Sequence, residues 1–237
     1  MMKPILLIDI DDTLLVFRAV PGVSYSTSSL ATVIRRYAVE ERGISETESR
    51  ACMEAVRKRI AWWSWSDFLD EFHFEPGPFW DYAREVESHY LIPAEPGLAD
   101  TLGRLHAAGC LLYITSNNPE DGIRHKLRLA GIARAEELFD GFFSATRLRA
   151  MKVEVGYWRK VIDAIGAPLE RLYPVGDNPE DDCRVPAQAG IRNSFLLRLQ
   201  KSPECLPAGC RVLANFLAIE RDLLVVPAGE TGKEIAG

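Results

Sequence analysis

The feature that most constrains the fold of this chain is an alternation of short apolar runs with helical patterns from residue 97 onward. Buried strands are predicted at four apolar runs bounded by turn residues: 110–115, 139–144, 172–175 and 195–199. Helical spacing fills the intervals between them, and Gly109, Gly131 and Gly166 follow the ends of three of these helices. Strands separated by helices form a parallel sheet that is covered on both faces. The sequence therefore predicts an α/β fold with an open parallel sheet.

The segment from residue 16 to residue 95 has a different pattern. It contains helix signals without a convincing central strand, and it holds 13 of the chain's 22 aromatic residues. Ser45 and Glu48 have the spacing of a capping box and predict a helix start. We expect a separate helical unit over 16–95, inserted into a core of residues 1–15 and 96–227, with a frayed tail at 228–237.

Aromatic residues in the inserted segment allow two interpretations. Four of the five tryptophans lie there: Trp62, Trp63, Trp65 and Trp80. They could line an apolar ligand pocket, but the hydrophobic core of the unit itself is the favoured interpretation, because aromatic side chains dominate the energetics of small cores.

Composition excludes several classes of function. The 237 residues carry a net charge of −6, which disfavours a nucleic-acid partner bound through its phosphates. No apolar stretch approaches the length of a membrane span, and the first strand begins too early to leave room for a signal peptide. Five cysteines without a CxxC pair indicate reduced thiols. We therefore expect a cytoplasmic protein without a nucleic-acid or membrane partner; its oligomeric state is open.

Clustered acids follow the first apolar run. Leu6 to Ile8 reads as a buried strand, and Asp9, Asp11 and Asp12 follow within four positions. Two carboxylates about 4 Å apart repel by roughly 1 kcal/mol in water and roughly 4 kcal/mol near a protein surface. A divalent cation relieves that repulsion, so the cluster predicts half of a metal site.

Three other polar groups follow predicted strands or open a helix. Ser116 and Asn117 come after 110–115, Lys152 opens a helix, and Gly176-Asp177 through Asp182 follows 172–175. Because ligands bind at the carboxyl ends of the strands in an open parallel sheet, these groups should share one crevice. Carboxylates suit Mg²⁺, while a hydroxyl, backbone N–H groups and a lysine suit a phosphate. One carboxylate can attack phosphorus and a second can transfer a proton.

These residues resemble the motifs of the haloacid dehalogenase (HAD) superfamily of phosphohydrolases. The matching motifs are Asp9-Ile10-Asp11-Asp12-Thr13, the apolar strand ending in Thr115-Ser116-Asn117, Lys152, and Gly176-Asp177 through Asp182. The resemblance covers roughly residues 5–200 and implies a Rossmann-like core, with 16–95 as the helical cap that such enzymes insert after their first motif. Asp12 stands where glycine is common, and Val153 stands where proline often follows the lysine.

The resemblance implies a role for each matched residue. Asp9 would be the nucleophile, and Asp11 the general acid and base. Ser116 would bind phosphate, with Thr115 as its rival for that role, and Lys152 would hold the nucleophile and the phosphate. Backbone N–H groups at Asn117 would add to the phosphate site.

A Mg²⁺ site is implied as well. Asp9 and Asp177 would be ligands, Asp11 would add its backbone carbonyl, and Asp182 would ligate directly or through water. These four residues are the expected metal set.

The acid at position 11 bears on the class of reaction. Dehalogenases and phosphonate-cleaving relatives lack an acid there, so Asp11 favours phosphate esters. We expect a Mg²⁺-dependent phosphatase that hydrolyses a small phosphorylated metabolite through an aspartyl-phosphate. A phosphomutase acting on a sugar phosphate with the same nucleophile, and a non-catalytic phosphate-sensing or partner-binding module, are the alternatives. The sequence does not name the substrate.

Overall fold

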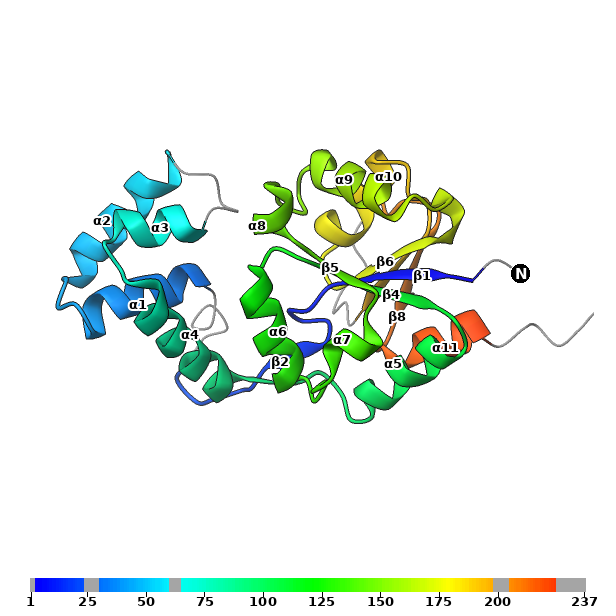
Figure 1. The fold of residues 1–237 in the computed structure, drawn as a ribbon, viewed down its shortest axis with the longest axis horizontal. Helices are drawn as coiled ribbons and strands as arrows, with labels where there is room; N and C mark the ends of the chain where they lie inside the picture. The colour runs from blue at the N-terminus through cyan, green and yellow to red at the C-terminus, as the bar shows by residue number, and fades with distance from the viewer. Residues whose placement is uncertain (1–2, 24–29, 60–64, 198–204, 225–237) are drawn as a thin grey trace, which may run out of the picture.

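A six-stranded parallel sheet forms the centre of the protein (Figure 1). The structure is a computed structural model and describes residues 3–23, 30–59, 65–197 and 205–224. In spatial order the strands are β5 (Gly141–Ser144), β4 (Leu111–Ser116), β1 (Ile5–Ile8), β6 (Leu172–Gly176), β7 (Ser194–Leu197) and β8 (Cys210–Leu213). The predicted α/β fold with a Rossmann-like parallel sheet is confirmed.

Successive strand residues point to opposite faces of the sheet. Because apolar side chains therefore lie on both faces, helices cover both of them. Leu6 and Ile8 of β1 share a core with α5 (Leu98–Ala107), α6 (Glu120–Leu129) and α11 (Leu217–Leu224). Ile5 and Leu7 pack with α9 (Val155–Ile165) and α10 (Val185–Gln188) on the other face. The short helices α7 (Ala135–Leu138) and α8 (Ala145–Leu148) flank β5 along the chain. The central strand β1 is therefore completely buried.

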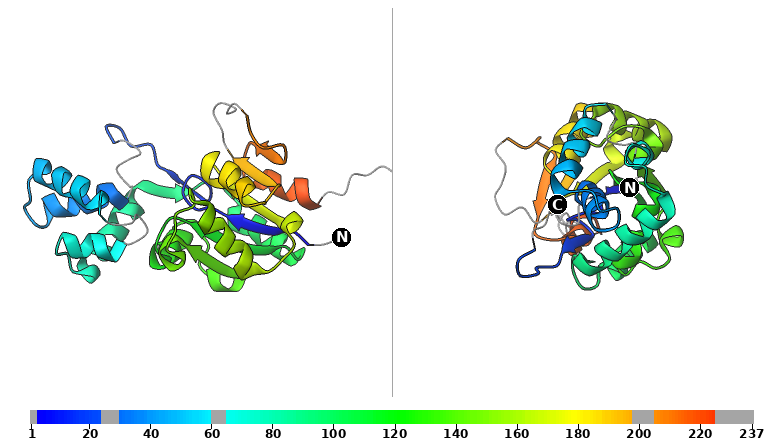
Figure 2. Two further views of the ribbon diagram at one scale, coloured as in Figure 1. Left: turned by 90° about the horizontal axis from the view of Figure 1, so that it is seen from above. Right: turned by 90° about the vertical axis from the view of Figure 1, so that its left-hand side faces the viewer.

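Four helices between β1 and α5 build a second unit with a hydrophobic core of its own (Figure 2). They are α1 (Leu30–Glu40), α2 (Glu46–Arg57), α3 (Trp65–Glu71) and α4 (Pro76–Tyr90). We call this unit the cap. Trp65 is buried in the core of the cap and Trp80 packs against it, as the favoured interpretation predicted, whereas Trp62 and Trp63 lie outside the described residues.

A two-stranded ribbon joins the cap to the sheet domain. Strand β2 (Leu15–Phe17) pairs antiparallel with β3 (Leu91–Pro93), and Phe17 is the register partner of Leu91. The sequence pattern did not predict this ribbon, because a three-residue strand is too short to show a period of two. Strand β8 was also missed, since this edge strand is mostly exposed and carries no continuous apolar run.

Three predicted boundaries differ from the structure. The strand predicted at 139–144 begins at Gly141, because the amide of Phe139 donates to Ala135 O (2.9 Å) and closes α7. Lys152 precedes α9, which begins at Val155. In the interval between the strands predicted at 172–175 and 195–199, where helical spacing was expected, residues 180–188 form a π-helical turn (Glu180–Arg184) followed by α10.

Two further expectations fall outside the described part of the chain: the end of the strand predicted at 195–199 and the tail at 228–237. Among the described residues, no helix has the length and apolar character needed to cross a lipid bilayer.

Candidate active site

The polar groups predicted to share a crevice line one cavity of about 220 Å³ at the carboxyl ends of β1, β4 and β6. The residues that line it are Asp9, Asp11, Asp12, Ser116, Asn117, Lys152, Asp177, Asn178, Asp181 and Asp182. The predicted site residues therefore line one cavity although their chain positions span most of the molecule, and the exception is Thr115, the rival of Ser116. The cavity holds six acids and a single lysine among its lining residues, so its field favours a cation.

Asp9 lies directly after β1 and is paired with a buried lysine. The amide of Asp9 donates to Val175 O (2.8 Å), which continues the β1–β6 ladder by one residue and fixes the side chain at the sheet edge. Lys152 Nζ lies 2.8 Å from Asp9 Oδ1 and 2.6 Å from Asp182 Oδ1. Lys152 is 2% exposed, and although burial alone would lower its pKa, Asp182 and Asp9 raise it above its ordinary value. The lysine is therefore a fixed positive charge.

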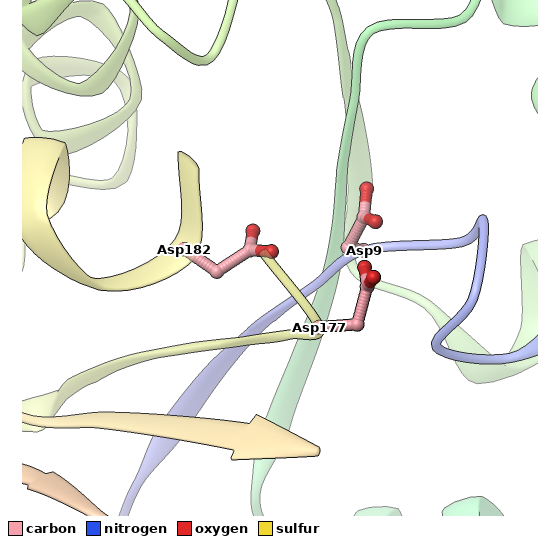
Figure 3. Close-up of side chains that lie close together, drawn as sticks. All are labelled: Asp9, Asp177 and Asp182. Atoms are coloured by element: carbon pink, nitrogen blue, oxygen red, sulfur yellow. The ribbon is translucent and has the colours of Figure 1, made fainter. Parts of the chain in front are cut away.

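Three carboxylates point into the same space. Figure 3 shows the side chains of Asp9 and Asp177, which directly follow β1 and β6, converging with that of Asp182 from the π-helical turn after β6. One oxygen of each lies within 4.8 Å of the others. Burial raises the pKa of Asp177 to about 7, with repulsion from Asp182 and Asp12 adding to the effect. Burial also raises the pKa of Asp9 well above its ordinary value, against the opposing effect of Lys152.

These shifts are those expected of carboxylates that are buried close together, where desolvation and, secondarily, mutual repulsion disfavour the charged forms. A divalent cation would supply a counter-charge, and three carboxylate oxygens in this space suit the hard ion Mg²⁺. The residues present therefore fit a metal held by Asp9 and Asp177, with Asp182 beside them.

Asp182 organises the turn that follows β6. Its Oδ2 accepts from the amide of Asn178 (3.1 Å), while its Oδ1 faces Lys152. Asn178 in turn accepts from the amide of Glu180 (2.9 Å) through its side chain. A Cβ on Gly176 would lie 2.0 Å from Asp182 Oδ2, so only glycine allows this approach. The fully buried Asp182 thus supports the lysine and the turn at the same time.

Asp11 is held by two partners that the sequence did not predict. Lys126 Nζ donates to Asp11 Oδ1 (2.7 Å), and Asn118 Nδ2 donates to Asp11 Oδ2 (2.6 Å). Burial alone would raise the pKa of Asp11, but the Lys126 ammonium and these hydrogen bonds lower it below its ordinary value. Asn118 could have been noticed, because it directly follows Asn117 at the strand end. Lys126 lies within a helix and had no such signal.

Ser116 and Thr115 differ in the direction they face. Ser116 lines the cavity, and its Oγ accepts from the amide of Asn118 (3.1 Å). Thr115, its neighbour in the strand, points to the opposite side, and its hydroxyl has no hydrogen-bond partner among the described residues. Ser116 is therefore the hydroxyl available to a ligand in the cavity.

Asn117 connects two loops with its side chain. Its Oδ1 accepts from the amide of Lys152 (2.8 Å), and its Nδ2 donates to Asp181 Oδ2 (3.3 Å). The side-chain amide is therefore engaged, and what Asn117 can offer an anion is its backbone N–H group.

The two departures from the motifs have different structural accounts. Asp12 has a φ of 55°, in the left-handed region that favours glycine and that aspartate tolerates better than most residues. Val153 is 55% exposed, one of the most exposed large apolar side chains in the described structure, and nothing around it explains the choice of valine.

Comparison with known proteins agrees with the fold and with the motifs. A profile of the haloacid dehalogenase-like hydrolases matches residues 4–190. A search of curated protein sequences found no match.

Solved structures with this fold include enzymes of different chemistry. A HAD phosphatase from Thermococcus onnurineus superposes with a TM-score of 0.65 at 21% identity, covering 94% of this chain and 98% of that one. A putative beta-phosphoglucomutase from Thermotoga maritima gives 0.57 at 16% identity, with 94% and 100% covered. A 2-haloacid dehalogenase from Pseudomonas syringae pv. Tomato gives 0.58 at 21% identity, with 94% and 98% covered. At these identities the likeness concerns the fold. Together with the profile match over most of its length, it shows that this chain belongs to the haloacid dehalogenase-like hydrolases.

Proposed function

We propose that this protein is a Mg²⁺-dependent phosphatase that hydrolyses a small phosphorylated metabolite through an aspartyl-phosphate on Asp9. The observation that carries the proposal is that Asp9 and Asp11, two positions apart, both line the cavity that contains Lys152 and Ser116. A nucleophile and a separate proton-transfer group are the pair that phosphate ester hydrolysis requires. A haloacid substrate gives no role to the second carboxylate.

The two half-reactions follow from these positions. A carboxylate oxygen of Asp9 attacks phosphorus, the bond from phosphorus to the ester oxygen breaks, and Asp11 gives its proton to the departing oxygen. Water then attacks the phosphoryl group as Asp11 takes a proton from it, and the bond to Asp9 breaks to release inorganic phosphate. Ser116 and Lys152 hold the phosphoryl oxygens during both steps.

Mg²⁺ would be held by the carboxylates of Asp9 and Asp177 and the backbone carbonyl of Asp11, with Asp182 in support. When bound, it neutralises charge between the acids and the phosphate dianion. The pKa of Asp177, which burial and then repulsion from Asp182 and Asp12 raise to about 7, supports this part of the proposal, because a bound cation would stabilise the charged carboxylate against both effects. The five cysteines are free thiols, which supports a cytoplasmic location.

Hydrolysis of p-nitrophenyl phosphate, with Mg²⁺ and with a chelator, tests the proposal. Asp9→Asn keeps the shape of the side chain and removes the nucleophile, so we expect kcat to fall by more than about 1,000-fold. Asp163→Asn, an exposed change on α9, is the matched control and should leave kcat unchanged. The proposal is contradicted if the Asp9→Asn variant keeps its activity, or if the chelator does not reduce the activity of the wild type.

The phosphomutase alternative can be separated by the fate of the aspartyl-phosphate. If water removes the phosphoryl group at the rate of steady-state turnover, the protein is a phosphatase. If the intermediate persists in water and reacts only when a sugar phosphate is added, the mutase replaces our proposal. A metabolite panel screened for phosphate release would then identify the substrate.

A further inference from the structure

Lys126 is a buried cation with a carboxylate on each side of the seam between the cap and the sheet domain. It lies on α6 and is 5% exposed. Its Nζ is 2.7 Å from Asp11 Oδ1 and 3.5 Å from Glu87 Oε1. Asp11 belongs to the loop after β1, whereas Glu87 belongs to α4 of the cap and is itself buried. One lysine thus connects a cap helix to the residue for which we propose proton transfer.

The hydrogen bonds of Asp11 do not suit its proposed task. Each of its carboxylate oxygens accepts a hydrogen bond, Oδ1 from Lys126 and Oδ2 from Asn118. To give a proton to a leaving group, one oxygen must carry that proton and face the substrate. An oxygen that accepts from an ammonium group does neither, so Asp11 has to exchange a partner before the first half-reaction.

Glu87 is placed to receive the lysine. Its Oε1 faces Lys126, and its Oε2 lies 3.5 Å from His125 Nε2. Burial, together with the nearby Arg128 and Arg84, lowers the pKa of His125 to about 4, so the ring is neutral at pH 7. Glu87 is therefore a buried carboxylate whose closest cation is one that it shares with Asp11. Burial disfavours the charged form of Glu87 and raises its pKa, and a closer approach of Lys126 to Glu87 offsets this effect.

We propose that Lys126 is a positioning residue that moves between Asp11 and Glu87, so that the approach of cap helix α4 releases Asp11 for proton transfer. The inference rests on the proposed phosphatase function. It makes Glu87 a residue of the cap that acts on the chemistry without touching the substrate. It also links the placement of the cap to the readiness of Asp11.

Leaving groups of different basicity provide the test. Phenyl phosphate needs a proton on its departing oxygen more than p-nitrophenyl phosphate does, because phenol is the weaker acid. Glu87→Gln keeps the shape of the side chain and removes the charge that attracts Lys126. We expect it to lower kcat/KM for phenyl phosphate by about ten-fold or more, and for p-nitrophenyl phosphate much less.

A double-mutant cycle tests whether the two residues act through each other. Because Lys126→Met removes the partner from which Asp11 must be released, it should not lower kcat/KM for phenyl phosphate selectively, and adding Glu87→Gln to it should cause no further loss. Glu85→Gln on α4 and Arg159→Met on α9 are exposed, matched controls, and both should behave as the wild type. Thermal unfolding of each variant separates lost stability from lost proton transfer.

Each result bears on one of the two proposals. If folded Glu87→Gln changes kcat/KM by the same factor for both substrates, or leaves both values unchanged, the inference is wrong and Lys126 does not move between the two carboxylates. If the losses of the two single variants add in the double variant, the coupling between them is wrong. If the wild type hydrolyses neither aryl phosphate with Mg²⁺ present, the phosphatase proposal fails, and this inference fails with it.

Discussion

Gly176 occupies a position in which no side chain fits, because the carboxylate of Asp182 lies where a Cβ would be. The two residues belong to the same turn, and their close approach places Asp182 beneath Lys152. Lys152 in turn pairs with Asp9. A backbone without a side chain at one position is therefore the first step in a chain of contacts that ends at the proposed nucleophile.

Substitution of this glycine tests the chain of contacts. Gly176→Ala forces Asp182 away from the strand, and we expect the free energy of unfolding in urea to fall by about 1–3 kcal/mol, as in overpacked cores. Phosphatase activity should fall with it, because Lys152 loses a partner. Gly103→Ala in α5 has open space around the new Cβ and should stabilise the helix by up to about 1 kcal/mol. Equal stability of the two variants would contradict the packing argument.

Site residues could be predicted from the sequence where they stand at the ends of apolar runs. Asp9 and Asp177 each follow a buried strand, and a parallel sheet brings such positions together. Lys126 and Glu87 could not be predicted, because each lies inside a helix whose packing partners no local pattern determines. Their contact with Asp11 exists only through the packing of α4 and α6.

At the scale of elements, local chemistry explains how α2 begins. Ser45 has an extended backbone, and its Oγ accepts from the amide of Glu48 (3.2 Å), which is the first half of the capping box predicted from the sequence. Glu46 and Glu48 add negative charge to the first turn, where the helix dipole favours it. The start of α2 was therefore readable in the sequence. The ribbon of β2 and β3 was not, because only its pairing stabilises such short strands.

Replacement of Ser45, the N-cap residue of α2, tests this account of the helix start. Ser45→Ala leaves an amide of the first turn without its acceptor, and we expect a loss of about 1 kcal/mol in the free energy of unfolding. Faster hydrogen exchange at the amides of α2 would locate the effect. Ser45→Asp restores an acceptor and should recover the stability. If the Ser45→Asp variant is as unstable as the Ser45→Ala variant, the side chain of Ser45 does not act as the N-cap of α2.

At the scale of the whole molecule, the crowded acids make stability depend on pH. The folded protein holds a proton on Asp177 up to about pH 7, whereas the unfolded chain releases it near pH 4. Between these values the native state binds more protons than the unfolded state. The free energy of unfolding of the metal-free protein should therefore fall as pH rises through this window. The raised pKa of Asp9 acts in the same direction.

Chemical denaturation at several pH values, with and without Mg²⁺, measures this dependence. The proposed Mg²⁺ site exists only in the native state and requires deprotonated ligands, so Mg²⁺ should stabilise the protein more at pH 8 than at pH 5. Asp177→Asn should flatten the pH dependence of the metal-free protein and reduce stabilisation by Mg²⁺. Asp163→Asn, exposed on α9, should behave as the wild type. A difference between wild type and Asp177→Asn that is constant with pH would contradict the assignment.

The ribbon of β2 and β3 has a consequence for how this protein can change. The chain leaves the sheet domain and returns to it at paired positions, Phe17 and Leu91. We therefore expect that the segment between them can be replaced as a unit while the loop after β1 keeps its acids in place. Glu87 belongs to this exchangeable segment, whereas its partner Lys126 belongs to the sheet domain. A cap grafted from another protein must therefore place a carboxylate near Lys126. Without one, Lys126 stays hydrogen-bonded to Asp11.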